Sequence, residues 1–148
     1  MSENPSILSH VSLGISDMRR AIAFYEPVLA TLGVNIVETI VDDMASAGEQ
    51  DASTPVAVAF GKAYPEFWLN DPVNEEPASV GNGTHVGFVA DSREAVDAFH
   101  AAALAAGAQD EGAPGERPHY GAPYYGCFVR DPDGHKIEAT FWDEAITM

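Results

Sequence analysis

Apolar and polar residues alternate in two stretches of the chain, Leu8–Ile15 and Gly83–Ala90. An alternation with a period of two predicts strands that have one face against a hydrophobic layer. After each stretch, apolar residues recur at helical spacing and the run ends at a glycine, Gly33 in the first copy and Gly107 in the second. This pattern predicts an amphipathic helix behind each strand.

The two copies belong to one internal repeat. The pairs that stand 75 positions apart include His10 with His85, Phe24 with Phe99, and Leu29 with Leu104. Ser16 and Asp91 are also equivalent, and each can cap the free amide groups at the start of the following helix. A constant offset over strand and helix indicates a duplicated structural unit.

Three further strand candidates follow each helix. They are Val34–Val41, Pro55–Gly61 and Glu66–Asn70 in the first copy, and Ala108–Glu111, Pro123–Arg130 and Lys136–Trp142 in the second. Asp131–Gly134 is a strong turn signal between the last two strands. The prediction is an α+β fold in which two paired βαβββ modules form a curved mixed sheet. The expected boundaries within a single domain of residues 1–148 are 6–70 for the first module, 71–82 for a linker and 83–143 for the second module.

The charge of the chain excludes some partners. It has 23 acidic and 7 basic residues, a formal net charge of −16, so it should repel nucleic acid. No stretch approaches the roughly 20 apolar residues of a membrane helix, and Met1–Pro5 lacks the pattern of a secretion signal. A cytoplasmic location without membrane contact is therefore expected. The single cysteine, Cys127, lies in an apolar run and is expected to be buried.

The predicted strand faces bring metal-binding side chains together. His10 and His85 alternate with the apolar residues that should face the helices, and Glu138 alternates with Ile137 and Ala139. Two sheets packed as one curved surface would direct His10, His85 and Glu138 into one cavity. Two imidazoles and a carboxylate suit a divalent metal ion and leave positions for water and substrate. These residue types fit Fe, Mn, Zn, Ni or Co and do not choose among them.

Three motifs surround these candidate ligands. They are Ser9–Leu13 followed by Asp17, then Thr84–Phe88, and finally Tyr124–Glu138. Together they resemble the vicinal-oxygen-chelate superfamily, which contains glyoxalases, bleomycin-resistance proteins and extradiol dioxygenases. The resemblance covers nearly the whole chain and implies a single glyoxalase-like domain of paired βαβββ modules. It also implies one divalent metal ion per site, which binds two neighbouring oxygens of a substrate.

The sequence departs from the glyoxalase pattern at one position. Glyoxalases have a fourth ligand, a carboxylate, on the last strand of the first module. Trp68 stands at that position here, and an indole cannot coordinate a metal. Glu66 lies two residues earlier on the same strand face, so a shift in register would make it the fourth ligand. With Trp68 in place, the three-ligand set is more similar to that of the extradiol dioxygenases.

Further side chains are candidates for proton transfer and substrate binding. The candidate catalytic residues on or beside the loop 112–121 are His119, Tyr120 and Tyr125. The candidate substrate-pocket residues are Trp68, Ser12 and Thr140. His135 follows the predicted hairpin turn and is expected at the surface.

Three functions remain open from the sequence. The first is a metal-dependent enzyme for a small molecule with adjacent oxygens, either a glyoxalase-type lyase or an extradiol-type dioxygenase, in which the metal is a Lewis acid. The alternative is a bleomycin-resistance-like protein that binds an aromatic or antibiotic ligand without catalysis. The third is a metal-sensing or structural interaction module. Exposed sheet edges predict a homodimer, with the site either within one chain or across two.

Overall fold

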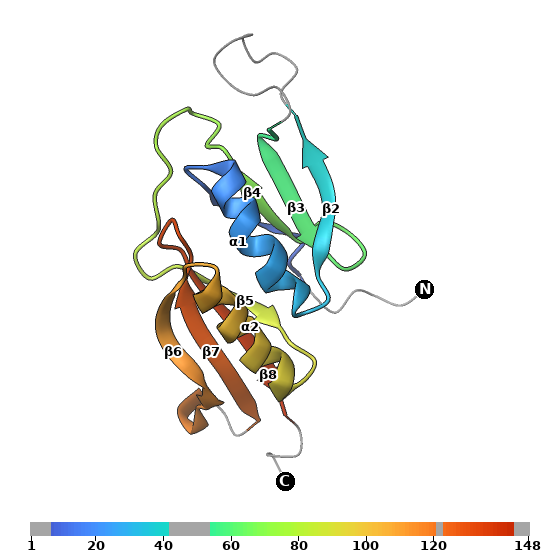
Figure 1. Cartoon of the computed structure of the whole chain (residues 1–148), viewed down its shortest axis with the longest axis vertical. Helices are drawn as coiled ribbons and strands as arrows, with labels where there is room; N and C mark the ends of the chain where they lie inside the picture. Colours follow the sequence, from blue (N-terminus) through green and yellow to red (C-terminus); the bar gives the residue numbers. More distant parts are fainter. Residues whose placement is uncertain (1–6, 42–53, 121–122, 144–148) are drawn as a thin grey trace.

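The computed structural model of the chain describes residues 7–41, 54–120 and 123–143. Along these ranges the chain follows the order strand, helix and three strands twice (Figure 1). The first unit contains β1 (Val11–Gly14), α1 (Met18–Ala30), β2 (Asn35–Ile40), β3 (Ala57–Gly61) and β4 (Phe67–Asn70). The second contains β5 (His85–Val89), α2 (Arg93–Ala105), β6 (Gln109–Glu116), β7 (Tyr124–Arg130) and β8 (Lys136–Trp142), with a short 3₁₀ helix, η1 (Pro118–Tyr120), before β7. The predicted pair of βαβββ modules is confirmed.

Each unit forms its own four-stranded mixed sheet. The strand orders are β1-β4-β3-β2 and β5-β8-β7-β6, and only the β1–β4 and β5–β8 pairs are parallel. The repeat extends to the register, because Ser12 pairs with Trp68 as Gly87 pairs with Glu138. Trp68 and Glu138 therefore hold equivalent positions, and β4 shows no shift that would bring Glu66 to the place of Trp68.

The helices cover one face of each sheet, and the two units lie end to end (Figure 1). The apolar helix stripes are buried as predicted, with Tyr25 and Leu29 of α1 and Val96 and Phe99 of α2 fully enclosed. Removing this apolar surface from water is the main favourable contribution to folding. The opposite face, called the open face below, is covered by neither α1 nor α2 (Figure 1), so its side chains are available for a site.

The helix caps differ from the predicted ones. Asp17 accepts a hydrogen bond from the backbone N–H of Arg20, and Ser92 accepts one from Ala95. Both caps lie one residue after the predicted Ser16 and Asp91, so those two assignments were wrong. An N-cap side chain accepts from the N–H two or three residues later. Because α1 begins at Met18 and α2 at Arg93, the residues directly before them, Asp17 and Ser92, are the ones in reach.

The turn between β7 and β8 of the second unit forms hydrogen bonds with the first unit. The Tyr25 hydroxyl of α1 donates to the buried carboxylate of Asp131, and the burial raises the pKa of Tyr25 well above its ordinary value. His135 Nε2 lies 2.6 Å from the Gly14 carbonyl oxygen, and Asp133 accepts from the Ser16 hydroxyl. His135 is buried, so the prediction that it lies at the surface was wrong. The turn makes contacts across the unit boundary that its local sequence does not reveal.

Two further predictions concern burial and membranes. Cys127 is fully buried against α2, and this burial raises the pKa of its thiol to about 12, as expected for an unreactive core cysteine. None of the helices in the described ranges is long and apolar enough to cross a membrane.

Candidate functional site

The second unit brings two of the three predicted metal ligands together. His85 begins β5 and Glu138 lies in the middle of the adjacent β8, and His85 Nε2 is 3.4 Å from Glu138 Oε1. Gly87 makes room for this pair, because a Cβ there would lie only 3.2 Å from Glu138 Oε1. The His85 side chain is 45% exposed and that of Glu138 is 13% exposed, so the pair can be reached from solvent.

Two hydroxyl groups orient the Glu138 carboxylate. Tyr124 donates to Oε2 at 2.6 Å, and Thr140 donates to the same oxygen at 2.8 Å. Burial and the neighbouring Glu138 raise the pKa of Tyr124, so its hydroxyl keeps its proton and remains a donor. Oε1 is left to face His85. A carboxylate fixed in this way by outer hydrogen bonds is typical of a metal ligand with its supporting groups.

An aromatic cavity of about 350 Å³ opens beside this pair. Its other lining residues are Tyr120, Tyr124, Phe128, Lys136 and Trp142. The rings of Tyr120 and Tyr124 meet edge to face at 5.0 Å, and those of Tyr124 and Trp142 at 5.4 Å. A cavity with apolar walls and a few convergent polar groups is the usual form of a small-molecule site.

The remaining predicted residues separate into two groups. Tyr120 lies in the cavity, and the His119 ring packs against it at 4.2 Å. Tyr125 was wrongly expected near the metal, because its side chain lies on the helix side, where its hydroxyl donates to Asp97 of α2 at 2.7 Å. Successive strand residues face opposite sides, so the residue that reaches Glu138 is Tyr124. Tyr124 lies on the same face of β7 as Phe128, which pairs with Glu138. The alternation along the strand could therefore have identified Tyr124 from the sequence.

His10 lies in the first unit, apart from the His85–Glu138 pair. It is exposed beside β1 and lines another cavity, of about 420 Å³, together with Glu66 and Lys62. Within the ranges that the structure describes, no group of three or more His, Cys, Asp or Glu side chains in one chain could hold a metal ion. One chain therefore joins His85 with Glu138 but does not bring His10 to them.

The predicted pocket residues divide in the same way. Ser12 and Trp68 are paired on the open face of the first sheet, where Ser12 is exposed and Trp68 half-buried. Thr140 is buried beside Glu138 on the second sheet. The three residues therefore do not line a single pocket within one chain, and Thr140 acts on Glu138 instead.

Sequence comparison identifies the family. The profile of the Glyoxalase/Bleomycin resistance protein/Dioxygenase superfamily matches residues 7–139. The chain belongs to this superfamily. No protein of curated function matches the chain in sequence.

Several solved structures of superfamily type are similar to the chain. A glyoxalase/bleomycin resistance protein from Albidiferax ferrireducens T118 is 34% identical, with 92% of this chain and 98% of that chain covered and a TM-score of 0.74. The fosfomycin resistance protein FosX from Listeria monocytogenes is 17% identical, with 97% and 98% covered and a TM-score of 0.60. A lactoylglutathione lyase from Agrobacterium tumefaciens is 21% identical, with 95% and 96% covered and a TM-score of 0.57. The last two share the fold alone.

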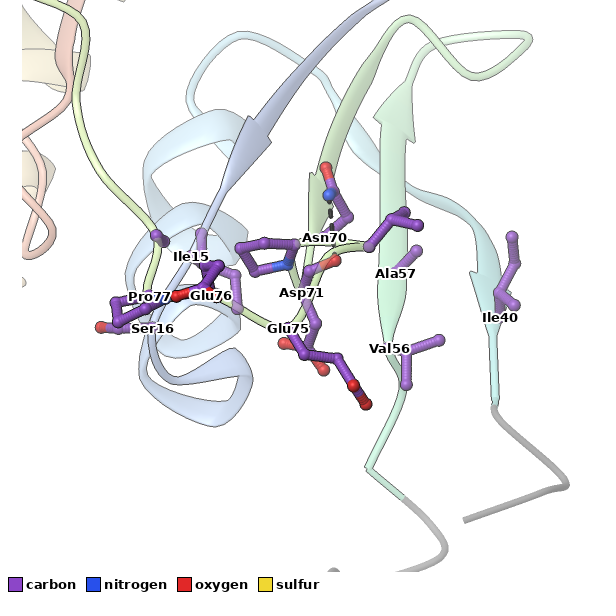
Figure 2. A pocket seen from close by; sticks show the side chains of 13 residues that line it. Ile15, Ser16, Ile40, Val56, Ala57, Asn70, Asp71, Glu75, Glu76 and Pro77 are labelled. Carbon is purple, nitrogen blue, oxygen red and sulfur yellow. Dashed lines mark hydrogen bonds between the residues drawn. The ribbon is translucent and has the colours of Figure 1, made fainter.

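A larger cavity, of about 810 Å³, lies in the first unit, at the end of the sheet away from His10 (Figure 2). Figure 2 shows Asp71, Glu75 and Glu76 around it together with Ile15 and other apolar side chains. None of its lining residues is a histidine. The superfamily residues that match the metal motifs are absent from its lining, so size alone does not identify the site. The His85–Glu138 cavity is the better candidate.

Proposed function

We propose that this chain is a metal-dependent enzyme of the glyoxalase/dioxygenase type that acts on a small molecule with two neighbouring oxygens. The observation that carries the proposal is the 3.4 Å approach of His85 to Glu138 beside the aromatic cavity, with Glu138 oriented by two hydroxyl groups. His10 of the partner subunit completes the ligand set in a homodimer.

The need for a second chain follows from the donor count. An open catalytic site uses three protein ligands, and the described part of one chain supplies two in one place. Exposed apolar side chains border the open faces of both units. In the first unit Leu8, next to His10, is 68% exposed, and in the second unit Val89 and Trp142 are 71% and 50% exposed. Pairing the first unit of one chain with the second unit of another would cover these side chains and bring His10 to the pair.

The side chains have distinct tasks in the proposed reaction. A divalent metal, when bound, supplies Lewis-acid polarisation of the two substrate oxygens. Tyr124 and Thr140 keep Glu138 in one orientation. Tyr120 lines the cavity, so its hydroxyl is the candidate group to hold or transfer a proton, and the His119 ring packs against it at a tilt. The rings of Phe128 and Trp142 form the apolar part of the cavity wall.

Subunit mixing tests both the ligand set and the shared site. His10→Ala and Glu138→Ala homodimers should each lose stoichiometric metal, measured by elemental analysis after addition of Fe, Mn, Zn, Ni or Co. Mixed dimers of the two variants contain one intact site, so random exchange should restore about a quarter of the wild-type sites. Metal bound by a monomeric wild-type chain, or no recovery in verified mixed dimers, would contradict the proposal.

Oxygen use separates the two candidate reactions. Oxygen uptake with a catechol would indicate ring cleavage, whereas conversion of a thiohemiacetal without oxygen would indicate a glyoxalase-type lyase.

The second candidate function is ligand binding without catalysis. The four aromatic rings around the cavity favour it, because planar ligands bind well between such walls. Quenching of tryptophan fluorescence by a bound aromatic drug, unchanged by His10→Ala, would support sequestration over metal-dependent catalysis.

A further inference from the structure

The basic residues of this acidic chain are few, and most of them are paired. Arg20, Lys62, Arg93 and Arg130 form ion pairs with carboxylates, and Arg19 donates a hydrogen bond to Thr54. The other two basic residues, Arg117 and Lys136, form no ion pair with any described residue. The chain has 23 acidic residues, so two cations without carboxylate partners are candidates for binding an external anion.

Arg117 and Lys136 lie against the same aromatic ring. The Lys136 ammonium nitrogen is 4.9 Å from the centre of the Phe128 ring, and the Arg117 guanidinium carbon is 6.0 Å from it. Phe128 is paired with Glu138 across the sheet and lines the same cavity, and Lys136 also lines it. The two cations therefore flank the aromatic wall of the candidate site.

Backbone contacts hold Arg117 in place while leaving donors free. Its Nη1 donates to the Gly115 carbonyl at 2.9 Å and its Nη2 to the Ala113 carbonyl at 2.8 Å. A guanidinium has five N–H donors, so three remain for a ligand.

We infer that Arg117 and Lys136 bind the carboxylate of an aromatic or other planar organic acid, whose ring lies against Phe128. This inference rests on the proposed function, since the oxygens to be activated would lie at the His85–Glu138 end of the same cavity. The charges are complementary, because a planar guanidinium and an ammonium beside the same ring supply donors for a carboxylate. Edge and face contacts with the cavity rings would hold an aromatic ring.

A matched pair of probes tests the inference. Benzoate carries the charge, and benzamide has nearly the same shape without it. Binding of both is measured by tryptophan fluorescence and calorimetry on the wild-type protein, on Arg117→Gln and Lys136→Gln, and on Arg19→Gln, which removes an equal charge from α1. Benzoate affinity should fall about tenfold in each cavity variant and stay unchanged in Arg19→Gln, while benzamide affinity should not change in any of them. Added salt should weaken wild-type binding of benzoate only.

Several outcomes would overturn the inference. They are the absence of benzoate binding by the wild-type protein, an equal loss for benzoate and benzamide, or a loss in Lys136→Gln that occurs together with dissociation into monomers. The last result would assign Lys136 to a contact between chains.

Metal content, measured on the same samples, separates the inference from the proposed function. Charge-dependent benzoate binding by a protein that takes up no metal would retain the anion site and contradict the metal-dependent reaction. Stoichiometric metal binding, together with benzoate binding that does not depend on Arg117 or Lys136, would support the metal-dependent reaction and contradict the anion site.

Discussion

Where the second unit places Glu138, opposite the large ring of Phe128, the first unit places Trp68, opposite the small side chain of Ala59. The two positions are equivalent in register, so the two pairs show which residues each copy places at the same point of its open face. Ala59, paired with Trp68, is fully buried, whereas Glu138 borders the aromatic cavity. One fold therefore supports a packed wall in one copy and a binding site in the other.

The residues around Glu138 and Trp68 also differ in a way that favours a site in the second unit only. Glu138 receives hydrogen bonds from Tyr124 and Thr140, and Gly87 leaves space beneath it. In the first unit the residue equivalent to Gly87 is Ser12, which lies beside an indole that needs no such space. Duplication preserved the backbone and the core, while a few open-face substitutions made the chemistry asymmetric. Breaking this asymmetry gives the following tests.

The largest expected effect is the loss of the second unit's carboxylate. Glu138→Gln should weaken metal binding by about 100-fold or more, because it removes the charged ligand while keeping the shape. The matched change Glu66→Gln in the first unit should alter the affinity by less than about threefold. Titration calorimetry with each metal measures both, and equal losses would show that the two units contribute equally.

The next effect concerns the hydrogen bond between Tyr25 of the first unit and Asp131 of the second. Tyr25→Phe should lower the free energy of unfolding by about 1–3 kcal/mol, because it leaves a buried oxygen of Asp131 without its donor. Tyr64→Phe, at a position that is 56% exposed, is the control and should have little effect. Urea denaturation followed by circular dichroism measures both. A neutral result for Tyr25→Phe would mean that the contact adds nothing net to stability.

Removing the hydroxyl that supports Glu138 should have a smaller effect than removing Glu138. Tyr124→Phe should weaken metal binding by about tenfold, whereas Tyr125→Phe, on the helix side of the same strand, should leave it unchanged. Metal titrations of the two variants side by side give the comparison. A similar loss in both would point to a general disturbance of β7.

Restoring a carboxylate to the first unit should sharpen the comparison further. Trp68→Glu places a carboxylate at the position equivalent to Glu138, so metal affinity should rise severalfold if His10 and Trp68 face the shared site. Trp68→Gln separates the gain of charge from the loss of the indole. Unchanged affinity in Trp68→Glu dimers would show that the first unit's open face does not reach the metal.

The smallest expected effect is a loss of stability at alkaline pH. Tyr25, Tyr124 and Tyr125 all have pKa values raised by burial and by neighbouring carboxylates, with Tyr125 at about 12. The unfolded chain releases these protons near pH 10, so the folded state should lose stability as the pH rises above about 10. Urea midpoints at pH 8 to 11 measure this, and Tyr25→Phe should reduce the slope. A slope that Tyr25→Phe leaves unchanged would assign the effect to other groups.

Sequence patterns determined the elements and their faces. The alternation around His10 and His85, the helical stripes and the 75-residue offset predicted two βαβββ units, because strand and helix periods are local properties of the chain. The same alternation correctly placed Glu138 and Thr140 on the face away from the core residues Ile137 and Ala139. The superfamily followed from these motifs.

Only the tertiary structure decided which faces meet. It joined His85 to Glu138 but left His10 in the other unit, and it buried His135 against the first unit. These outcomes depend on the packing of units that are far apart in sequence, and a local period carries no information about such distances. The periodicity fixes the direction of each side chain from its own strand, whereas the shape of the whole molecule sets its partners.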